Sequence, residues 1–523
     1  MLERVVGRMF RAATSRTENC SNPVNMNAST SHDSTNGQPT QARLQGDVQI
    51  NNTDHVLLKI ATLYAERLMS DVTLVVGGVE YPAHRLILCA SSEVFQVMLM
   101  SPRWSESHES RVVLQESGPC SDIFGEFLSY FYTGRIRINQ HTIMPVLLLA
   151  DKYNVKDLTE LCGQYMCDHI AHAATNNQLI TWFQYALSLS HYQVAQACEN
   201  FLKWNFELVA RASDFVNLQQ DVFVRILQQS DLVVHNEMTV YNIVVQWLEA
   251  QTLFEDDPDV EEEMFQMIKQ VMEPIRFPMM SPRQLAELLL SPLTKAYKEF
   301  FIERMAIGMS YHSNQIERIL QVCQMEDGRL MFTPRLYTAD RWCSLLSVEN
   351  FSQLQAYNTR TLVFSSQAVV AEYAGEKSCD WVIDLYPKGV WFRKFFLIVW
   401  QGTMEVPECV LRTVRVSVTC REFPSGGEDF RARIGLLITG VQDGVEHTMA
   451  VYQRCHRFSQ EDKVLHLDDI VEYDDLNESF NNPKQSPFLV GENRDVFKLN
   501  IVITPLTEYC YPDENVPIEM LVR

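Results

Sequence analysis

The sequence has no apolar run that approaches the roughly 18–20 residues of a membrane-spanning helix. Basic side chains are also scarce, since 44 Lys and Arg stand against 66 Asp and Glu, giving a formal net charge of -22. Phosphate contacts need a basic face, so binding to nucleic acid is not expected. We therefore predict neither a membrane nor a nucleic acid as a partner.

Motifs of catalytic and metal sites are missing as well. The 13 cysteines are scattered, and none shows the close double spacing of a zinc ribbon or finger. Neither a phosphate-binding loop nor a nucleophile elbow is present, and His84 has no Ser, Cys or carboxylate beside it in a catalytic motif. We expect no enzyme activity, no catalytic residue, no cofactor and no metal; His84 should pack, and the cysteines should be reduced and buried.

Residues 1–50 are predicted to be disordered. From residue 17 onward the segment is rich in Ser, Thr, Asn, Gln and Gly, which cannot bury enough surface to offset the entropy of ordering. The basic stretch Met1–Arg16 lacks the apolar core of a secretory signal peptide, which favours a cytoplasmic location. Export remains the alternative, because glycosylation acceptor tripeptides begin at Asn27, Asn51, Asn350 and Asn477.

The pattern from residue 53 to 170 indicates a compact α/β unit. An amphipathic helix capped by Thr53 is followed by a strand over Val72–Val76, a Gly77-Gly78 turn and a returning strand. A helix from His84 to about Met100, a third strand over Arg111–Leu114 and further helices complete the unit. The first helix carries an apolar stripe made of Leu57, Ile60, Ala61, Tyr64 and Leu68.

Two further domains are predicted. Residues 171–315 show helical periodicity almost throughout, as in an antiparallel helical array. In residues 325–523 the period changes to two, most clearly over Val414–Cys420 and Phe497–Ile503, which predicts an antiparallel β-sandwich. Shorter expected strands are Trp381–Leu385, Phe395–Trp400, Ile434–Ile438, Met449–Gln453 and Val464–Leu467.

The α/β unit closely resembles a BTB/POZ domain. The resemblance is carried by Asp71–Gly78 (DVTLVVGG), Tyr81–Ser92 (YPAHRLILCASS), Phe127–Gly134 (FLSYFYTG) and Leu149–Val155 (LADKYNV). So many matched positions in the family's order identify the domain.

The other two domains resemble known families over shorter stretches. The helical region is similar to the BACK domain that often follows BTB, through Asn236-Glu237, Trp247 and Ile275–Ser281. The C-terminal region looks like a MATH/TRAF-type sandwich, best at Lys388–Phe392. The BTB–BACK arrangement is similar to that of the BTB/POZ domain-containing protein 17 group, which is related to exported galectin-binding glycoproteins.

The BTB resemblance implies a homodimer. In that family the first helix packs against the partner subunit, which assigns the stripe of Leu57, Ile60, Ala61, Tyr64 and Leu68 to the interface. Asp71 and Arg85 match the positions that form a charged pocket close to the interface, so we expect an ion pair that fixes pairing geometry.

The same resemblance implies a partner at one loop. In BTB adaptors for cullin-3 ubiquitin ligases, the corresponding loop carries a hydrophobic residue and, two positions later, a glutamate. Trp104 and Glu106 occupy these positions, although the family more often has Met, Phe or Leu in place of the tryptophan. An exposed tryptophan is also a typical interface anchor on physical grounds.

The sequence therefore favours a homodimeric substrate adaptor for a cullin-3 ubiquitin ligase, with an unknown protein substrate held by the β-sandwich. The main alternative is an oligomeric scaffold or exported adhesive BTB-BACK protein without a role in ubiquitylation. A transcriptional repressor would need a DNA-binding module, and neither zinc-finger spacing nor a basic region occurs.

Overall fold

The computed structural model describes residues 51–251, 258–325, 328–368, 370, 378–390, 396–399, 402–405, 411–423, 429–477 and 486–506. The segment predicted to be disordered (1–50), part of the acidic run after residue 251, and Trp391 and Phe392 of the MATH-like fragment lie outside these residues. Contacts divide the chain into residues 1–56 and residues 57–523. In the first unit, Asn51 Oδ1 accepts hydrogen bonds from the Thr53 backbone N–H (3.0 Å) and hydroxyl (2.6 Å) where α2 (Thr53–Ala65) begins.

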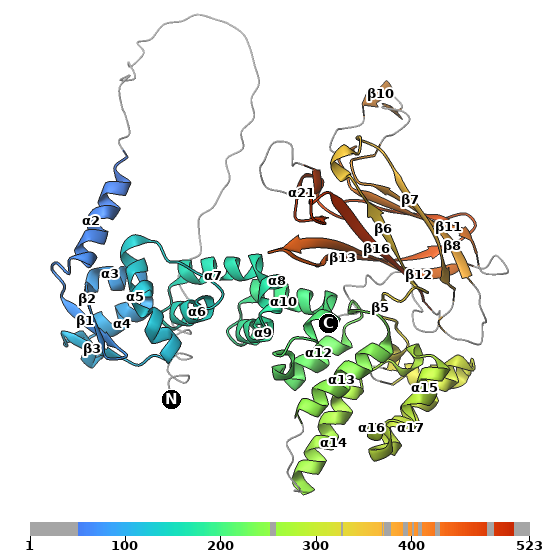
Figure 1. The fold of residues 1–523 in the computed structure, drawn as a ribbon, viewed down its shortest axis with the longest axis horizontal. Helices are drawn as coiled ribbons and strands as arrows, with labels where there is room; N and C mark the ends of the chain where they lie inside the picture. Colours follow the sequence, from blue (N-terminus) through green and yellow to red (C-terminus); the bar gives the residue numbers. More distant parts are fainter. Residues whose placement is uncertain are drawn as a thin grey trace, which may run out of the picture. The chain divides into compact units, whose positions relative to one another are not determined.

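The N-terminal α/β unit is built on a small mixed sheet of order β2-β1-β3 (Figure 1). β1 and β2 pair antiparallel across Gly77 and Gly78, whose φ angles of 56° and 83° suit glycine in a two-residue hairpin turn, and β1 pairs parallel with β3. The elements after α2 are β1 (Val72–Val76), β2 (Val79–Ala83), α3 (Arg85–Ser91), α4 (Glu93–Met100), η1 (Ser105–Ser107), β3 (Arg111–Leu114), α5 (Gly118–Thr133), α6 (Ile143–Lys152) and α7 (Lys156–Asp168).

The single helix expected from His84 to about Met100 is divided at Ser92. This residue is extended (φ -141°, ψ 120°), and its Oγ accepts from the N–H of Phe95 at 3.1 Å, which caps α4. The same hydroxyl donates to the carbonyl of Tyr153 at 2.5 Å. Helical periodicity continues across the break because both helices bury the same side, so the apolar pattern alone does not reveal it.

The middle of the chain is helical, as predicted. Its elements are α8 (Ile170–Thr175), α9 (Leu179–Ser188), α10 (Tyr192–Trp204), α11 (Phe206–Val209), η2 (Phe215–Asn217), α12 (Gln220–Gln228), β4 (Val233–Val234), α13 (Glu237–Gln251), α14 (Pro258–Met272), η3 (Phe277–Met279), α15 (Pro282–Leu288), α16 (Pro292–Ala296), α17 (Lys298–His312), α18 (Ile316–Cys323) and α19 (Gly328–Met331). Local sequence fixes several starts. For example, Ser281 and Gln284 form a reciprocal capping box at α15, with Pro282 at the first helical position.

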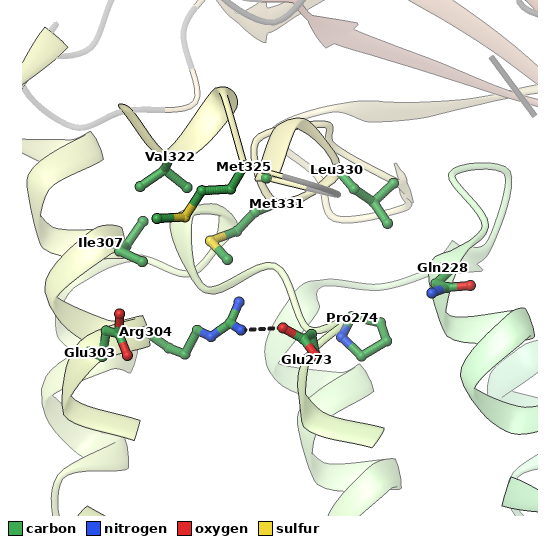
Figure 2. A pocket seen from close by; sticks show the side chains of 11 residues that line it. Gln228, Glu273, Pro274, Glu303, Arg304, Ile307, Val322, Met325, Leu330 and Met331 are labelled. Atoms are coloured by element: carbon green, nitrogen blue, oxygen red, sulfur yellow. Dashed lines mark hydrogen bonds and ion pairs between the residues drawn. The ribbon is translucent and has the colours of Figure 1, made fainter. Parts of the chain in front are cut away.

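A small pocket of about 130 Å³ lies among the last helices of this region (Figure 2). Its wall combines the ion pair between Arg304 and Glu273, with Nη2 and Oε1 2.6 Å apart, and the methionines Met325 and Met331. Its lining residues do not bring a nucleophile and a base together. We assign no function to this pocket.

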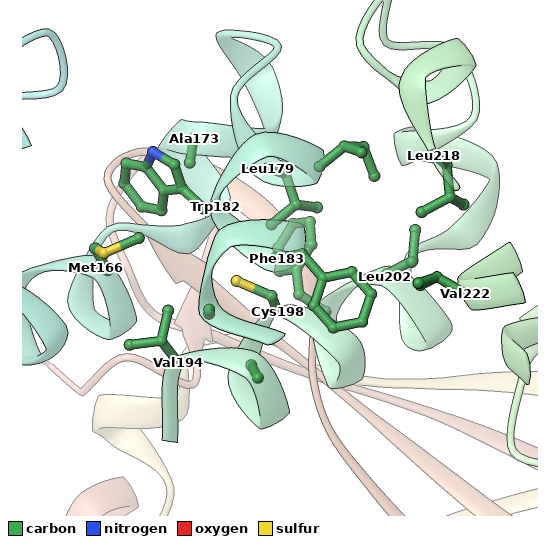
Figure 3. Packing of buried hydrophobic residues seen from close by; sticks show 14 of the residues in the cluster. Met166, Ala173, Leu179, Trp182, Phe183, Val194, Cys198, Leu202, Leu218 and Val222 are labelled. Carbon is green, nitrogen blue, oxygen red and sulfur yellow. The ribbon is translucent and has the colours of Figure 1, made fainter. Parts of the chain in front are cut away.

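Most buried apolar side chains of the α/β unit and the helical region form one continuous cluster, from Val72 to Trp342, while those of the last helices, such as Ile319 and Phe332, form a separate one. Figure 3 shows part of the continuous cluster, where α9 and α10 bring together Phe183, Cys198 and Leu202. Trp247 is 2% exposed in this cluster, and its indole N–H donates to the carbonyl of Leu218 at 3.2 Å. The helical region therefore shares its core with the α/β unit.

The C-terminal region is an antiparallel β-sandwich, which confirms the predicted fold class. Its sheets have the orders β14-β11-β8-β7 and β13-β12-β16-β15, with β6 also beside β16 (Figure 1). The elements are β5 (Leu336–Tyr337), β6 (Cys343–Val348), η4 (Phe351–Gln353), β7 (Arg360–Gln367), β8 (Ser378–Tyr386), β9 (Phe396–Val399), β10 (Gly402–Glu405), β11 (Arg415–Glu422), β12 (Phe430–Gln442), β13 (Val445–Phe458), β14 (Val464–Leu467), α21 (Tyr473–Asn477), β15 (Leu489–Val490) and β16 (Val496–Pro505).

Alternating side chains from the two sheets form the sandwich core. On β8, residues 379, 381, 383 and 385 are fully buried, while the residues between them are half-buried. The Trp381 ring lies 5.0 Å from that of Phe458 on the opposite sheet. The period of two in the sequence thus corresponds to an inner and an outer face.

Within the described ranges, no helix combines the length and the apolar composition that a bilayer span requires. The same ranges contain no group of three or more His, Cys, Asp or Glu side chains arranged to hold a metal ion.

Candidate functional site

The predicted apolar stripe is divided between two environments, and its last member, Leu68, lies beyond α2, which ends at Ala65. Leu57 and Leu68 are 46% and 45% exposed, whereas Ile60, Ala61 and Tyr64 are half-buried. Tyr64 stacks on Tyr132 of the same subunit, with ring centroids 4.5 Å apart, and Ile60 packs on the domain's own core. The middle of the stripe therefore anchors the helix, and Leu57 and Leu68 remain exposed.

Asp71 and Arg85 meet in an arrangement that the sequence interpretation did not anticipate. Asp71 Oδ1 accepts a hydrogen bond from the backbone N–H of Arg85 at 2.8 Å, at the start of α3. In the described part of the chain, no ion pair joins the two side chains. Asp71 thus satisfies a free backbone donor of the helix instead.

The Arg85 guanidinium orders the loop between α4 and β3. Nη1 donates to the carbonyls of Leu99 (2.8 Å) and Ser107 (3.2 Å), and Nη2 donates to those of Glu106 (3.4 Å) and Glu109. One half-buried cation therefore binds carbonyls from both ends of the loop. Its planar fork of donors suits this task better than a lysine ammonium would.

This loop presents Trp104 and Glu106. The Trp104 side chain is 40% exposed, while its carbonyl accepts from the N–H (3.2 Å) and the hydroxyl (2.7 Å) of Ser107 in the single turn η1. Glu106 is half-buried, and its carboxylate accepts from the Ser105 hydroxyl at 3.0 Å. An exposed indole on an ordered backbone is pre-organised for contact with another protein.

His84 has structural partners. Its Nε2 lies 2.7 Å from the carbonyl of Leu68, so this nitrogen carries the proton, and its Nδ1 lies 3.1 Å from the hydroxyl of Tyr132. Burial raises the pKa of Tyr132 to about 12, and the phenol also accepts from the backbone N–H of His84 at 2.9 Å. These contacts fit the packing role expected for His84.

A buried charged cluster, here called the Glu237 network, lies where the helical region meets the β-sandwich. It consists of Glu237 at the start of α13, Arg276 before η3, and Arg335 and Tyr337 in the segment leading into the sandwich. Glu237 is 1% exposed and both arginines are 0% exposed. Arg335 Nε donates to Glu237 Oε2 at 3.0 Å, the Tyr337 hydroxyl donates to the same oxygen at 2.6 Å, and the Arg276 N–H donates to Oε1 at 2.8 Å.

Carbonyl groups accept most of the remaining hydrogen bonds of the two arginines, although the buried Nε of Arg276 has no partner among the described residues. Arg335 donates to the carbonyls of Leu227 (2.6 Å), Gln229 (2.8 Å) and Pro274 (2.9 Å). Arg276 Nη1 donates to the carbonyl of Thr333 at 2.5 Å. Burial lowers the pKa of Arg276 to about 9, which leaves it charged at neutral pH.

Further contacts join the sandwich to the helical region. β5 pairs parallel with β4, and Val233, Leu336, Leu437 and Val502 form a separate apolar cluster. A Cβ at Gly435 would lie only 2.7 Å from Leu336 Cδ2, so a larger residue here would displace the end of this buried leucine.

The turn between β12 and β13 contacts the end of α7 and the start of α8. Asp443 Oδ2 lies 2.7 Å from Nδ1 of His169. The Gln442 amide donates to the Cys167 carbonyl at 3.1 Å and accepts from the Ala171 N–H at 3.0 Å. The sandwich thus contacts the helices here, at the Glu237 network, and between Asn205 and Thr448.

The sequence interpretation misses the Glu237 network. Glu237 and Arg276 lie within fragments that match the BACK family, but their roles need the three-dimensional contacts. One local indication exists, because Arg276 and Arg335 each lie between apolar residues, in Ile275–Phe277 and Pro334–Leu336. Such flanks favour burial of an arginine, and a buried arginine needs a partner.

Comparison with known families assigns each of the three regions to a domain family. Residues 61–170 match the BTB/POZ domain, residues 179–290 match the BACK domain (BTB And C-terminal Kelch), and residues 332–507 match the BTBD17 TRAF domain. The third match begins beside Thr333 and so includes Arg335 and Tyr337. All three are protein-interaction domains.

Individual relatives share part of this architecture. BTB/POZ domain-containing protein 17 of Xenopus laevis is 28% identical over 340 residues, which cover 65% of this chain and 65% of that protein. The chain thus spans a little under two thirds of this relative's length. Galectin-3-binding protein of Rattus norvegicus is 25% identical over 304 residues (57% of this chain, 49% of that protein). Human Kelch-like protein 11 is 27% identical over 278 residues (51% and 37%).

These matches confirm the resemblance found in the sequence. The chain contains a BTB/POZ domain, a BACK domain and a C-terminal TRAF-like domain, and it is similar to BTB/POZ domain-containing protein 17.

Proposed function

We propose that the protein is a non-enzymatic, homodimeric substrate adaptor for a cullin-3 ubiquitin ligase in the cytoplasm. The observation that carries the proposal is the exposed Trp104 side chain on a loop whose backbone Arg85 orders. The similarity to Kelch-like protein 11 over 278 residues supports it. Other subunits of a ligase supply the chemistry, so an adaptor needs no catalytic residue of its own.

Dimerisation is proposed to use the exposed ends of the apolar stripe. Leu57 and Leu68 offer apolar side chains to a partner subunit, while Tyr64 and Ile60 hold the helix on its own domain. Burial against a second copy would remove this apolar surface from water. Asp71 and Arg85 support the interface by fixing the start of α3 and the adjoining loop.

The TRAF-like domain is proposed to hold the protein substrate. Its contacts with the BACK domain through the Glu237 network, and with the end of the BTB domain through the β12–β13 turn, support a fixed orientation between substrate and ligase. A fixed orientation favours ubiquitin transfer to a limited set of substrate lysines.

The test is a pull-down of cullin-3 from cells with Trp104→Ala/Glu106→Ala beside the wild type. We expect the wild type to retain cullin-3 and the double variant to lose most of it, because truncating a central anchor typically costs 2 kcal/mol or more, roughly a thirtyfold change in affinity. Tyr192→Ala is the matched control, since it removes another exposed aromatic side chain (79% exposed) from the BACK domain. Equal retention by the double variant, or none by the wild type, would contradict the proposal.

Arg85→Ala is predicted to weaken cullin-3 binding although it leaves Trp104 and Glu106 in place. Loss of its bonds to four carbonyls would loosen the loop, and re-ordering it on binding would cost about 1–2 kcal/mol, or roughly tenfold in affinity. Amide hydrogen exchange of residues 101–110 should become faster in the variant. Faster exchange with unchanged affinity would show that loop order is not required.

An exported scaffold is the second candidate, and the similarity to galectin-3-binding proteins favours it. Of the acceptor tripeptides, Asn51 and Asn350 are exposed. Asn477 is half-buried and its amide donates to the carbonyls of Pro387 (3.0 Å) and Tyr473 (3.1 Å), so it is a poor acceptor in the folded chain. Treatment with a glycosidase should lower the mass of an exported chain. A smaller loss of mass from Asn350→Gln than from the wild type would support this candidate over the adaptor.

A further inference from the structure

Two cysteines come together in the core of the TRAF-like domain. Cys379 lies on β8 and Cys420 on the neighbouring strand β11, and both are 0% exposed. Cys420 pairs with Trp381 across the two strands. Cys379 lies two residues before Trp381 on β8, so the side chains of both residues point to the same face of the sheet. The register of the two strands shifts immediately after Cys420, between Cys420 and Glu422. The pairing therefore places the two side chains next to each other on the inner face of one sheet.

The two thiols interact directly. The Cys379 thiol is hydrogen-bonded to the Cys420 sulfur, and the Cys420 thiol lies 3.6 Å from the carbonyl of Glu422. The bond to Cys420, together with burial, raises the pKa of Cys379. The same bond lowers the pKa of Cys420 in spite of its burial. Cys420 is therefore the thiol that loses its proton first.

We propose that Cys379 and Cys420 form a cross-strand dithiol that closes to a disulfide when the domain meets a low-molecular-weight disulfide such as oxidised glutathione. A disulfide needs neighbouring Cα atoms and converging Cβ atoms. The two cysteines lie diagonally across adjacent strands, next to a register shift, with their thiols in contact. The proposal is independent of cullin binding. In a reducing compartment the site remains a dithiol, and in an oxidising one it becomes a bond.

The exchange takes place in two steps. The Cys420 thiolate attacks one sulfur of oxidised glutathione, whose S–S bond breaks, and one glutathione leaves as a thiolate that takes up the proton lost from Cys420. Cys379 then gives up its proton and attacks the Cys420 sulfur of the mixed disulfide, and the second glutathione leaves with that proton. Two protein thiols are oxidised by two electrons, and one glutathione disulfide is reduced to two thiols.

Burial determines when this reaction occurs. Since neither sulfur is exposed, glutathione reaches the pair before the sandwich closes or while it opens transiently. A chain that folds in an oxidising compartment should therefore acquire the bond during folding. A folded, reduced chain should acquire it slowly, at a rate set by opening.

The test expresses the full chain in the cytosol and, behind a secretory signal, in the secretory pathway of the same cells. Free thiols are blocked with N-ethylmaleimide during denaturation, and peptides are mapped without reduction. We expect a peptide linking Cys379 to Cys420 in the secretory sample and two blocked thiols in the cytosolic one. Incubation of the cytosolic protein with oxidised glutathione should produce the same linked peptide over time.

Variants make the assignment specific. Cys379→Ser and Cys420→Ser should each abolish the linked peptide, whereas Cys343→Ser, which removes a half-buried thiol on β6, should leave it unchanged. The linked wild type should also unfold at a higher temperature than the same protein after reduction. Blocked thiols at both positions in the secretory and glutathione-treated samples would overturn the proposal, as would stable bonds from either cysteine to other cysteines.

Discussion

Glu237→Gln is expected to destabilise the BACK domain by about 3–5 kcal/mol, because it leaves Arg335 charged, buried and without its counter-ion. Arg335 is 0% exposed, and its Nε lies 3.0 Å from Glu237 Oε2. The neutral amide also places an N–H₂ group at one of the two oxygen positions that now accept from the Arg276 N–H and the Tyr337 hydroxyl. The variant should lower the urea midpoint for the transition reported by Trp247 fluorescence.

The matched control for this variant is Glu93→Gln, at the α4 end of an exposed ion pair with Lys156 (2.7 Å). Both side chains are more than 60% exposed, so solvent screens the pair and the midpoint should change little. Limited proteolysis after Thr333 should separate the TRAF-like domain faster in Glu237→Gln than in the control. Equal midpoints for the two variants would contradict the role assigned to the network.

The network also predicts a dependence of stability on pH. Burial alone would raise the pKa of Glu237, but the charges of Arg335 and Arg276 and the bond from Tyr337 outweigh it and hold the pKa below its ordinary 4.5. A carboxylate with a depressed pKa contributes stability that is present above the unfolded value of 4.5 and is lost as pH falls through the folded value. The wild type should therefore lose stability more steeply below pH 4.5 than Glu237→Gln does.

Trp381→Ala is the second change with a large expected effect, about 3–5 kcal/mol of the stability of the TRAF-like domain. The indole is 0% exposed, lies against Phe458 of the opposite sheet, and donates to the Ser366 hydroxyl at 2.9 Å. Its removal leaves a cavity between the sheets and an unpaired hydroxyl. Calorimetry should show a lower melting temperature for this domain.

Trp104→Ala should affect binding and not stability, in contrast to Trp381→Ala. The Trp104 side chain is 40% exposed, so its loss should change the melting temperature little while it removes cullin-3 binding. Trp381→Ala, in turn, should leave the BTB surface intact. Loss of stability on removal of Trp104, or none on removal of Trp381, would mean that the two roles are assigned wrongly.

The repeating patterns of the sequence predict most of the fold. The period of two over Val414–Cys420 corresponds to β11 (Arg415–Glu422), and Val464–Leu467 matches β14 at both ends. The β1–β2 turn follows from Gly77 and Gly78, which adopt the positive φ angles expected of them. Such features depend on neighbouring residues along the chain or on a single buried face. Both produce a residue pattern that can be recognised in the sequence.

Features that depend on distant residues were not predictable. Ser92 ends α3 because its hydroxyl reaches Tyr153, 61 positions further along the chain. Arg335 bonds to Glu237, 98 positions away. The guanidinium of Arg85 bonds to the carbonyls of Leu99 and Ser107 rather than to the Asp71 carboxylate. Trp104 could be singled out by its resemblance to a family motif, but its exposure on an ordered backbone is visible only in the structure.

The most direct test of the adaptor proposal is the mass of the complex formed by the purified chain and purified cullin-3, measured by light scattering after size-exclusion chromatography. We predict two copies of each protein in the wild-type complex. Leu57→Asp should give one copy of each, because it places a charge on the proposed dimer face. Trp104→Ala/Glu106→Ala should elute as a free dimer. A wild-type chain that elutes as a monomer, or apart from cullin-3, would contradict the account.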